Sequence, residues 1–249
     1  MSTASQPGNQ TSSQSSPGAS GNNSSNRGQG GARGGRGGGR PRGADSPTVR
    51  LSKALSWLLR HNAAAQGVAI RPDGYVLIKD VLAHSKFKGY SIPQIMEVVD
   101  TNDKKRFQVL SDEQGNPEWI RAVQGHSLQT VTDPGLEPLD ASLIPDAVHG
   151  TMFSKWPLIG AQGLNKMGRN HIHMAIGLLG TEGVISGMRG SCNLYIHIDT
   201  AKAIADGYKF YKAANNVILS DGKNGEGIIP PEYFSKVVRS NGEVILPAP

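Results

Sequence analysis

The first 47 residues contain no Val, Ile, Leu, Phe, Trp or Tyr, and are rich in Gly, Ser and Arg. A segment without large apolar side chains cannot bury enough surface to offset the conformational entropy lost on folding. We therefore expect residues 1–47 to be a disordered tail. The remaining part, about 200 residues long, is enough for one ordinary core or two small ones.

Most of the net positive charge of the chain comes from this tail. The formal net charge is +6, and five arginines of the tail supply most of it: Arg27, Arg33, Arg36, Arg40 and Arg42. The Arg/Gly stretch could follow RNA phosphates, or it could be a dispensable solvated extension. The rest of the chain is only mildly basic, so an anion site there depends on a few well-placed arginines.

Several classes of protein are excluded by missing patterns. The sequence has no P-loop, no His-Glu-x-x-His, no paired Cys-x-x-Cys and no G-x-S-x-G. We therefore expect no metal site. Cys192 is the only cysteine, which rules out an intrachain disulfide. No stretch has the apolar length of a membrane span, and no secretory signal is evident. We expect a soluble monomer in the cytoplasm, the nucleus or both.

The first half of the remaining chain reads as helices followed by a hairpin. Leu51, Leu55, Leu58 and Leu59 recur at helical spacing, and Ser91 with Pro93 is typical of a helix start. We expect helices over residues 49–61, 79–82 and 94–102 and strands over 75–78, 106–110 and 119–122. Three helices and a hairpin indicate a winged-helix module over 48–125.

The second half alternates short strands and short helices. Residues 126–146 lack periodicity and hold three prolines, which predicts a linker. We expect a strand ending at Val148, strands over 171–174, 194–198, 216–219 and 237–238, and helices over 153–163 and 201–206. This alternation indicates an α+β module over 147–240, followed by a tail over 241–249.

Two cationic positions could bind a phosphate. Arg60 and His61 end the first helix, where a guanidinium could clamp a phosphate and the imidazole could transfer a proton. The same pair could simply meet the negative end of the helix dipole. Arg106 begins a strand that could hold it rigidly, or it is an ordinary surface charge. The pattern alone leaves these interpretations open.

Residues 167–174 are the most informative stretch. His171 and His173 lie two apart, so on a strand they point to the same face. Arg169 shares that face if the strand extends back to it. Such a face would line a cleft, although a solvent-exposed edge or an adventitious metal site would show the same pattern.

Two short Gly-containing stretches could contact a ligand. Glycine lets a ligand approach the backbone, and neighbouring polar side chains supply hydrogen-bonding groups. The stretches are His149-Gly150-Thr151 and Ser186-Gly187-Met188-Arg189. Each could equally be an ordinary turn or surface loop.

Taken together, these patterns resemble the Tpt1/KptA family of RNA 2′-phosphotransferases. The matching stretches are residues 51–61, 73–75, 100–102 with 105–107, 120–127, 149–151, 167–173, 185–189 and 216–220. They occur in family order across about residues 50–240, and the tail lies outside them. Met174 stands where the family pattern has Leu or a similar residue, which is a conservative apolar change.

The resemblance implies a fold and a set of site residues. It implies an N-terminal winged-helix lobe joined to a C-terminal lobe with the ADP-ribosyltransferase fold. The implied catalytic residues are Arg60, His61, Arg106 and Arg169, with Arg169 preferred to Arg189 because it directly precedes the His-x-His strand. The implied NAD-binding residues are His149, Gly150, Thr151, His171, His173, Ser186, Gly187 and Arg189.

The resemblance also implies a reaction. The splice-junction 2′-phosphate of tRNA passes to NAD, a co-substrate, and no metal takes part. The products are RNA with a free 2′-hydroxyl, nicotinamide and ADP-ribose 1″,2″-cyclic phosphate. One alternative is an NAD-dependent ADP-ribosyltransferase acting on phosphorylated nucleic-acid ends, which would leave ADP-ribosylated RNA. The other is a non-catalytic RNA-binding protein, which would release no nicotinamide.

Overall fold

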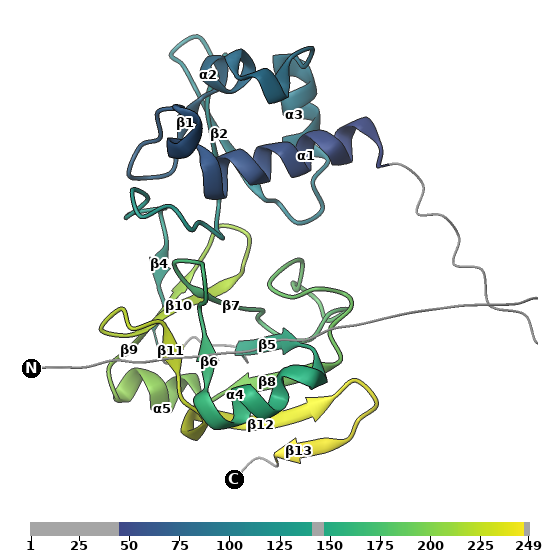
Figure 1. Cartoon of the computed structure of the whole chain (residues 1–249), viewed down its shortest axis with the longest axis vertical. Coiled ribbons are helices and arrows are strands. Elements are labelled where there is room, and N and C mark those ends of the chain that lie inside the picture. Colours follow the sequence, from purple (N-terminus) through teal and green to yellow (C-terminus); the bar gives the residue numbers. More distant parts are fainter. Residues whose placement is uncertain (1–44, 141–146, 247–249) are drawn as a thin grey trace, which may run out of the picture. The chain divides into compact units, whose positions relative to one another are not determined.

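The computed structural model describes residues 45–140 and 147–246, which form helices and several antiparallel sheets (Figure 1). The expected α+β class is confirmed. The predicted disordered tail lies outside the described residues up to residue 44, and so does the end of the predicted linker, residues 141–146.

The first helix starts earlier than predicted and changes geometry at its end. α1 (Pro47–Trp57) is capped by the Ser46 hydroxyl, which accepts a hydrogen bond of 3.2 Å from the Val49 amide. A π-helical turn, Leu58–Asn62, follows directly, with a 2.9 Å bond from the Ala63 amide to the Leu58 carbonyl. Single π turns inside α-helices frequently accompany functional sites. This one carries Arg60 and His61.

The rest of the N-terminal half packs on α1. Its elements are α2 (Ile78–Ala83), α3 (Ile92–Asp100), the short turns Ala64–Gln66 and Ser85–Phe87, and the strands β1 (Val76–Leu77), β2 (Phe107–Ser111) and β3 (Pro117–Ala122). The strands form one antiparallel sheet in the order β1-β3-β2, so the predicted hairpin is confirmed. The predicted strand over 75–78 ends one residue early because Ile78 begins α2. A core that includes Leu55, Phe87, Ile95 and Ile120 lies between helices and sheet.

The C-terminal half contains two four-stranded sheets and a two-stranded one. The first sheet has the order β4 (Glu137–Pro138), β9 (Tyr208–Lys212), β10 (Ile218–Lys223), β7 (Ile172–Met174). The second has the order β13 (Val244–Leu246), β12 (Phe234–Arg239), β8 (Leu194–Ile198), β5 (Ala147–Thr151). The remaining elements are β6 (Leu164–Asn165) paired with β11 (Ile228–Ile229), α4 (Trp156–Gln162), α5 (Thr200–Ala205) and the turns Phe153–Lys155 and Pro231–Tyr233.

The edges of the two larger sheets meet at β5 and β7. Val148 and Ala175 exchange two backbone hydrogen bonds of 2.9 Å each. The strand predicted to end at Val148 instead runs to Thr151 and pairs with β8 throughout. The His149-Gly150-Thr151 stretch is therefore strand, not a strand-ending turn, and it lies beside the strand that carries His173.

The described part of the predicted linker is hydrogen-bonded to both halves of the chain. The His126 carbonyl accepts a 2.9 Å bond from the Asn170 amide, and the Thr132 amide donates to the Pro72 carbonyl at 3.1 Å. Further along, β4 pairs with β9. Similarly, β13 lies in the segment expected to be a tail and pairs with β12. These short strands have no local periodicity, because pairing with distant strands forms them.

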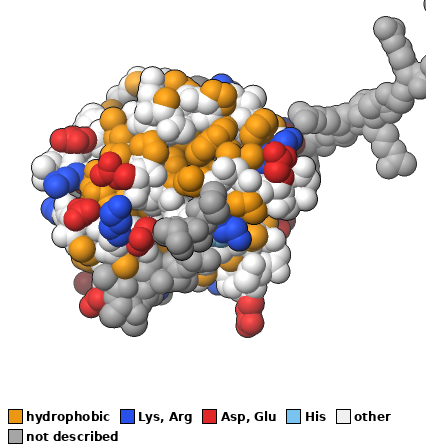
Figure 2. Space-filling model, turned by 90° about the horizontal axis from the view of Figure 1, so that it is seen from below, with side chains coloured by type: hydrophobic (Ala, Val, Ile, Leu, Met, Phe, Trp, Pro, Cys, Tyr) orange, Lys and Arg blue, Asp and Glu red, His pale blue; other side chains and the backbone are white. Residues whose placement is uncertain are grey.

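Hydrophobic side chains gather on the face shown in Figure 2, which is the lower side of Figure 1, where α4, β12 and β13 lie. Leu158 of α4 is 55% exposed and Val244 of β13 is 51% exposed. No helix in the described ranges is long and apolar enough to cross a membrane.

The end of α4 gives a testable prediction about stability. Gly163 closes the helix as predicted, with φ of +85°, and a Cβ there would collide with the Ile229 carbonyl oxygen. Gly115, in the turn between β2 and β3, has nearly the same φ of +84° and open space around it. We expect Gly163→Ala to lower the free energy of unfolding by about 2–4 kcal/mol and Gly115→Ala by about 1 kcal/mol. Equal losses in denaturant titrations would contradict this account.

Candidate functional site

Arg60 and His61 are fixed by the π turn and by the chain after β3. The Arg60 carbonyl accepts a 2.9 Å bond from the Ser127 amide, and the His61 Nδ1 atom lies 2.9 Å from the Ser127 hydroxyl. A Cβ at Gly125 would lie 3.4 Å from the Arg60 Nε atom, so the guanidinium packs directly on this glycine. Segments 60–61 and 125–127 thus form one wall of the site.

Three of the predicted catalytic residues come together although they are far apart in sequence. Burial, together with the charges of Arg106 and Arg169, lowers the pKa of Arg60 to about 10. Arg106 immediately precedes β2, where its Nη1 atom donates to the Asn102 side-chain oxygen at 3.2 Å. Arg169 lies in an exposed turn before β7. The strand does not extend back to Arg169, so Arg169 does not share the strand face of His173, yet its charge lowers the pKa of Arg60.

The charge of Arg60 is not compensated within the described part of the chain. Its Nε and Nη2 atoms are buried there without a hydrogen-bond partner. None of the charges that shift its pKa is a carboxylate. A buried donor without an acceptor is costly, and a crowded set of guanidinium groups is costlier still. The arrangement therefore favours an anion held by several arginines.

A hydrogen-bonded pair, Gln124 and His173, joins the segment after β3 to β7. The His173 Nδ1 atom donates to the His171 carbonyl at 3.0 Å, and its Nε2 atom lies 2.8 Å from the Gln124 amide oxygen. Burial lowers the pKa of His173 well below its usual value, so the ring is neutral and Nε2 accepts. The side-chain amide of Gln124 is therefore turned by about 180°, so that its NH₂ group, and not its oxygen, faces Nε2 and donates to it.

His173 in turn orients His149. The His149 Nδ1 atom donates to the His173 carbonyl at 2.8 Å, which leaves its Nε2 atom as the acceptor. Burial lowers the pKa of His149, and Arg169 adds to this effect. Both ring nitrogens of His173 are engaged, so any direct contact of that ring with a ligand requires the loss of one of these bonds.

We expect the Gln124–His173 contact to be measurable in pH-dependent stability. Gln124→Leu leaves a buried ring nitrogen unpaired and should lower the free energy of unfolding by about 1–3 kcal/mol at pH 8. In Gln124→Glu the carboxylate should raise the pKa of His173 from its lowered value, so the variant should lose less stability than wild type as the pH falls from 8 to 5. Denaturant titrations at pH 5 and pH 8 test this. A Gln124→Glu profile parallel to wild type would contradict it.

His126 is a buried residue of the site to which the pattern assigned no role. Its side chain is 3% exposed, and within the described residues its Nε2 atom has no hydrogen-bond partner. Burial lowers its pKa to about 4, with contributions from Arg60 and Arg121. A Cβ at Gly74 would lie 3.2 Å from the Nε2 atom, so the turn before β1 covers the ring closely. The sequence places His126 in a family stretch, but only the structure reveals its burial.

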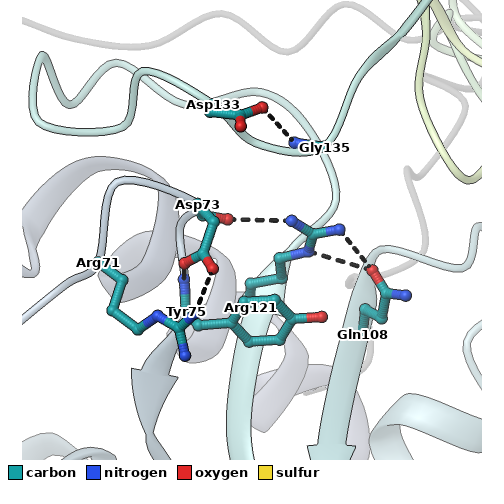
Figure 3. Close-up of polar contacts among 7 residues, drawn as sticks. All are labelled: Arg71, Asp73, Tyr75, Gln108, Arg121, Asp133 and Gly135. Atoms are coloured by element: carbon teal, nitrogen blue, oxygen red, sulfur yellow. Dashed lines mark hydrogen bonds and ion pairs between the residues drawn. The ribbon is translucent and has the colours of Figure 1, made fainter.

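A polar network beside His126 holds that turn in place (Figure 3). The Arg121 guanidinium donates to the Gln108 side-chain oxygen at 3.1 and 2.8 Å and to the Asp73 carbonyl at 3.1 Å. It also lies 4.6 Å from the centre of the Tyr75 ring. All three guanidinium nitrogens of Arg121 thus donate to protein groups, in contrast to Arg60, and we assign Arg121 a structural role.

His171 lies just before β7 and contacts other residues than His173 does. Its ring meets the Tyr211 ring edge-on at 6.0 Å between centroids. Burial lowers its pKa, whereas the charge of Asp221 raises it. The Asp221 Oδ1 atom is buried without a partner among the described residues. The two histidines therefore share a strand face in sequence but have separate neighbours.

The glycines of the predicted NAD site are required by protein packing. A Cβ at Gly150 would lie 2.7 Å from Met188 Cβ, and one at Gly187 would lie 2.7 Å from Ala175 Cα. The expected close approach of a ligand to these glycines is therefore not what explains them. Packing does bring Ser186 and Arg189 next to β5 and β7, and the charge of Arg189 lowers the pKa of Arg169.

No group of three or more His, Cys, Asp or Glu residues in the described ranges could hold a metal ion.

The comparisons with known proteins agree with the pattern of the site. Residues 46–222 match the family model described as RNA 2′-phosphotransferase, Tpt1 / KptA family. The chain is 49% identical over 200 residues to a putative tRNA 2′-phosphotransferase of Schizosaccharomyces pombe, covering 80% of this chain and 54% of that protein. It is 45% identical over 201 residues to tRNA 2′-phosphotransferase 1 of Danio rerio (80% and 88% covered). It is 39% identical over 205 residues to the Saccharomyces cerevisiae tRNA 2′-phosphotransferase (78% and 85% covered).

The chain belongs to the Tpt1/KptA family of RNA 2′-phosphotransferases. The prediction of an RNA 2′-phosphotransferase is confirmed by this family, and the relatives above are named tRNA 2′-phosphotransferases. The chain spans about half of the S. pombe relative and most of the other two.

Proposed function

We propose that Arg60, Arg106 and Arg169 bind the 2′-phosphate of spliced tRNA and that the chain passes this phosphate to NAD. The observation that carries the proposal is the uncompensated charge of Arg60, with two buried donor atoms that have no partner among the described residues. A phosphate oxygen between the arginines supplies both acceptor and counter-charge.

The phosphate itself is suited to such a site. A phosphate monoester has a second pKa of about 6, so near pH 7 it is largely a dianion. It therefore attacks without first losing a proton, and the main requirement is accurate positioning. Three arginines on separate segments fix the phosphate from several directions, which a single flexible lysine could not do.

We also propose the lobe identities that follow from family membership. The three helices and the β1-β3-β2 sheet correspond to a winged-helix lobe over about residues 48–125. The sheets that meet at β5 and β7 correspond to an ADP-ribosyltransferase-like lobe over about residues 147–240. In this assignment the arginines from the first lobe face the NAD-binding residues of the second.

The residues of the proposed second lobe suit NAD, the co-substrate. We propose that His149, Thr151, His171, Ser186 and Arg189 hold NAD, with His173 and the two glycines maintaining their arrangement. Supporting features are the His149 Nε2 atom, which is left as an acceptor, and the buried Asp221 oxygen beside His171. Bound NAD supplies an anomeric carbon from which nicotinamide leaves when the RNA phosphate attacks it.

The second step needs proton transfer and charge stabilisation. The ribose 2″-hydroxyl attacks the phosphorus, and the RNA 2′-oxygen leaves. Partial burial lowers the pKa of His61, and Arg60 and Arg169 lower it further, so the ring is neutral at pH 7 and able to accept a proton. The arginines stabilise negative charge that develops on the phosphate oxygens.

The direct test uses purified full-length chain, NAD and a short RNA with one internal 2′-phosphate. The proposal predicts RNA with a free 2′-hydroxyl, with nicotinamide released in equal amount. Accumulation of ADP-ribosylated RNA would instead indicate a transferase that stops after the first step. RNA binding without nicotinamide release would indicate a non-catalytic binder.

A further inference from the structure

A shallow groove lies along α1, away from the predicted site residues. It is lined by Arg50, Lys53, Ala54 and Trp57 of α1 and by Lys86 of the turn after α2, with a volume of about 280 Å³. Three of its five lining residues are cations and none is acidic. Neither the proposed phosphate transfer nor the proposed NAD site uses any of them.

The cations of the groove are available for an external anion. Lys53 forms an ion pair of 2.6 Å with Asp45, but the two side chains are 67% and 42% exposed, so the pair is weak. The Arg50 Nη1 atom donates to the Asp45 carbonyl at 2.8 Å, and within residues 45–140 and 147–246 no other hydrogen bond of this side chain is found. The Lys86 Nζ atom lies 4.6 Å from the Trp57 ring centroid, so the ring keeps this charge over the groove.

The groove leads toward the proposed phosphate site. Positions 50, 53, 54 and 57 lie on one side of α1, and His61 follows Trp57 after four residues, about one helical turn. At about 1.5 Å per residue, Arg50 lies roughly 16 Å from His61 along the helix. This is the length of a few nucleotides, and α1 leads directly into the π turn that carries His61 (Figure 1).

We propose that this groove binds the single-stranded RNA that flanks the 2′-phosphate. Backbone phosphates contact Arg50, Lys53 and Lys86, and a base or ribose packs on the apolar floor formed by Ala54 and Trp57. Single-stranded RNA is bound by this combination of cations along a groove and an aromatic side chain. The inference rests on the proposed function, because the position of the 2′-phosphate sets which part of the RNA reaches the groove.

The test compares two triple variants on two substrates. The groove variant is Arg50→Ala with Lys53→Ala and Lys86→Ala. The matched control is Lys155→Ala with Lys209→Ala and Lys236→Ala, which removes the same charge from exposed positions of the C-terminal half. The substrates are a 2′-phosphorylated RNA of about ten nucleotides and a 2′-phosphorylated dinucleotide. We expect the KM of the groove variant for the longer RNA to rise about tenfold or more, with kcat unchanged, from the loss of up to three phosphate contacts.

On the dinucleotide, the KM of the groove variant should stay within about twofold of wild type, since the flanking phosphates are missing. Equal effects on both substrates, or equal effects of both triple variants, would overturn the proposal. RNA binding is also measured without NAD, by fluorescence anisotropy over a salt series. The slope of log affinity against log salt should fall by about 2 in the groove variant. If the expected difference in salt slope between wild type and the groove variant were found, but wild type transferred no phosphate, the proposed function would fail and the proposed RNA groove would stand.

Discussion

Replacing Arg60 by methionine is expected to abolish phosphate transfer and, at the same time, to stabilise the ligand-free protein. Arg60 holds a charge that is partly desolvated and close to two other guanidinium groups. Because its pKa is lowered from 12.5 to about 10, the charged form costs up to about 3 kcal/mol in the folded state at neutral pH. Methionine fills a similar volume without this cost. Loss of one donor aimed at transition-state charge typically reduces turnover by about 10²–10³-fold or more.

Two measurements separate these effects. Denaturant titration gives the free energy of unfolding, which should be equal to or greater than that of wild type. Single-turnover assays give the rate, which should fall at least about a thousandfold. Arg239→Met is the matched control, since Arg239 is paired with Glu243 at 2.6 Å on the far strand β12. It should leave turnover near wild type. An Arg60→Met variant that is active, or much less stable, would contradict the assigned role.

The free energy of unfolding is expected to fall steeply as the pH drops from about 6.5 toward 4. His126 has its pKa lowered to about 4, chiefly by burial. In this window the unfolded chain binds a proton that the folded chain does not. The stability that depends on neutral His126 is therefore complete above about pH 6.5 and is lost as pH falls, by up to about 3 kcal/mol at pH 4.

Four other histidines of the site act in the same direction. Burial is the main cause of the lowered pKa of His61, His149, His171 and His173. The free energy of unfolding of wild type should therefore fall more steeply with decreasing pH than the uptake of a single proton on unfolding would allow. His126→Leu should reduce the loss between pH 6.5 and 4 by about 3 kcal/mol. Urea titrations across this range measure it. Parallel curves for the variant and wild type would show that His126 is not buried in its neutral form.

The fold was predictable where the sequence carries local periodicity. The repeating leucines of α1, the Ser91 start of α3 and the strand Leu194–Ile198 all follow from side-chain spacing. The two-residue strands β4, β6 and β11 were not predicted, because only a distant partner strand makes them extended. The shift of β10 to Ile218 also has a local cause, since Asn216 adopts φ of +59° in the preceding turn.

The candidate site was also predictable only in part. Family stretches identified Arg60, Arg106 and Arg169, and the structure brings their charges together. The condition for Arg169 to share the face of the two histidines, a strand that reaches back to it, is not met because β7 begins only at Ile172. Gln124 and His126 gained no role from pattern, since neither type nor spacing reveals burial or a bond to a residue 49 positions away.

The central claim is that the phosphate leaves the RNA and ends on the ribose of NAD. The most direct measurement follows a radioactive label on the 2′-phosphate of a short RNA during incubation with the protein and NAD. The account predicts that all released label appears in ADP-ribose 1″,2″-cyclic phosphate, and only when NAD is present. Label released as inorganic phosphate, or label retained on the RNA while nicotinamide is freed, would contradict it.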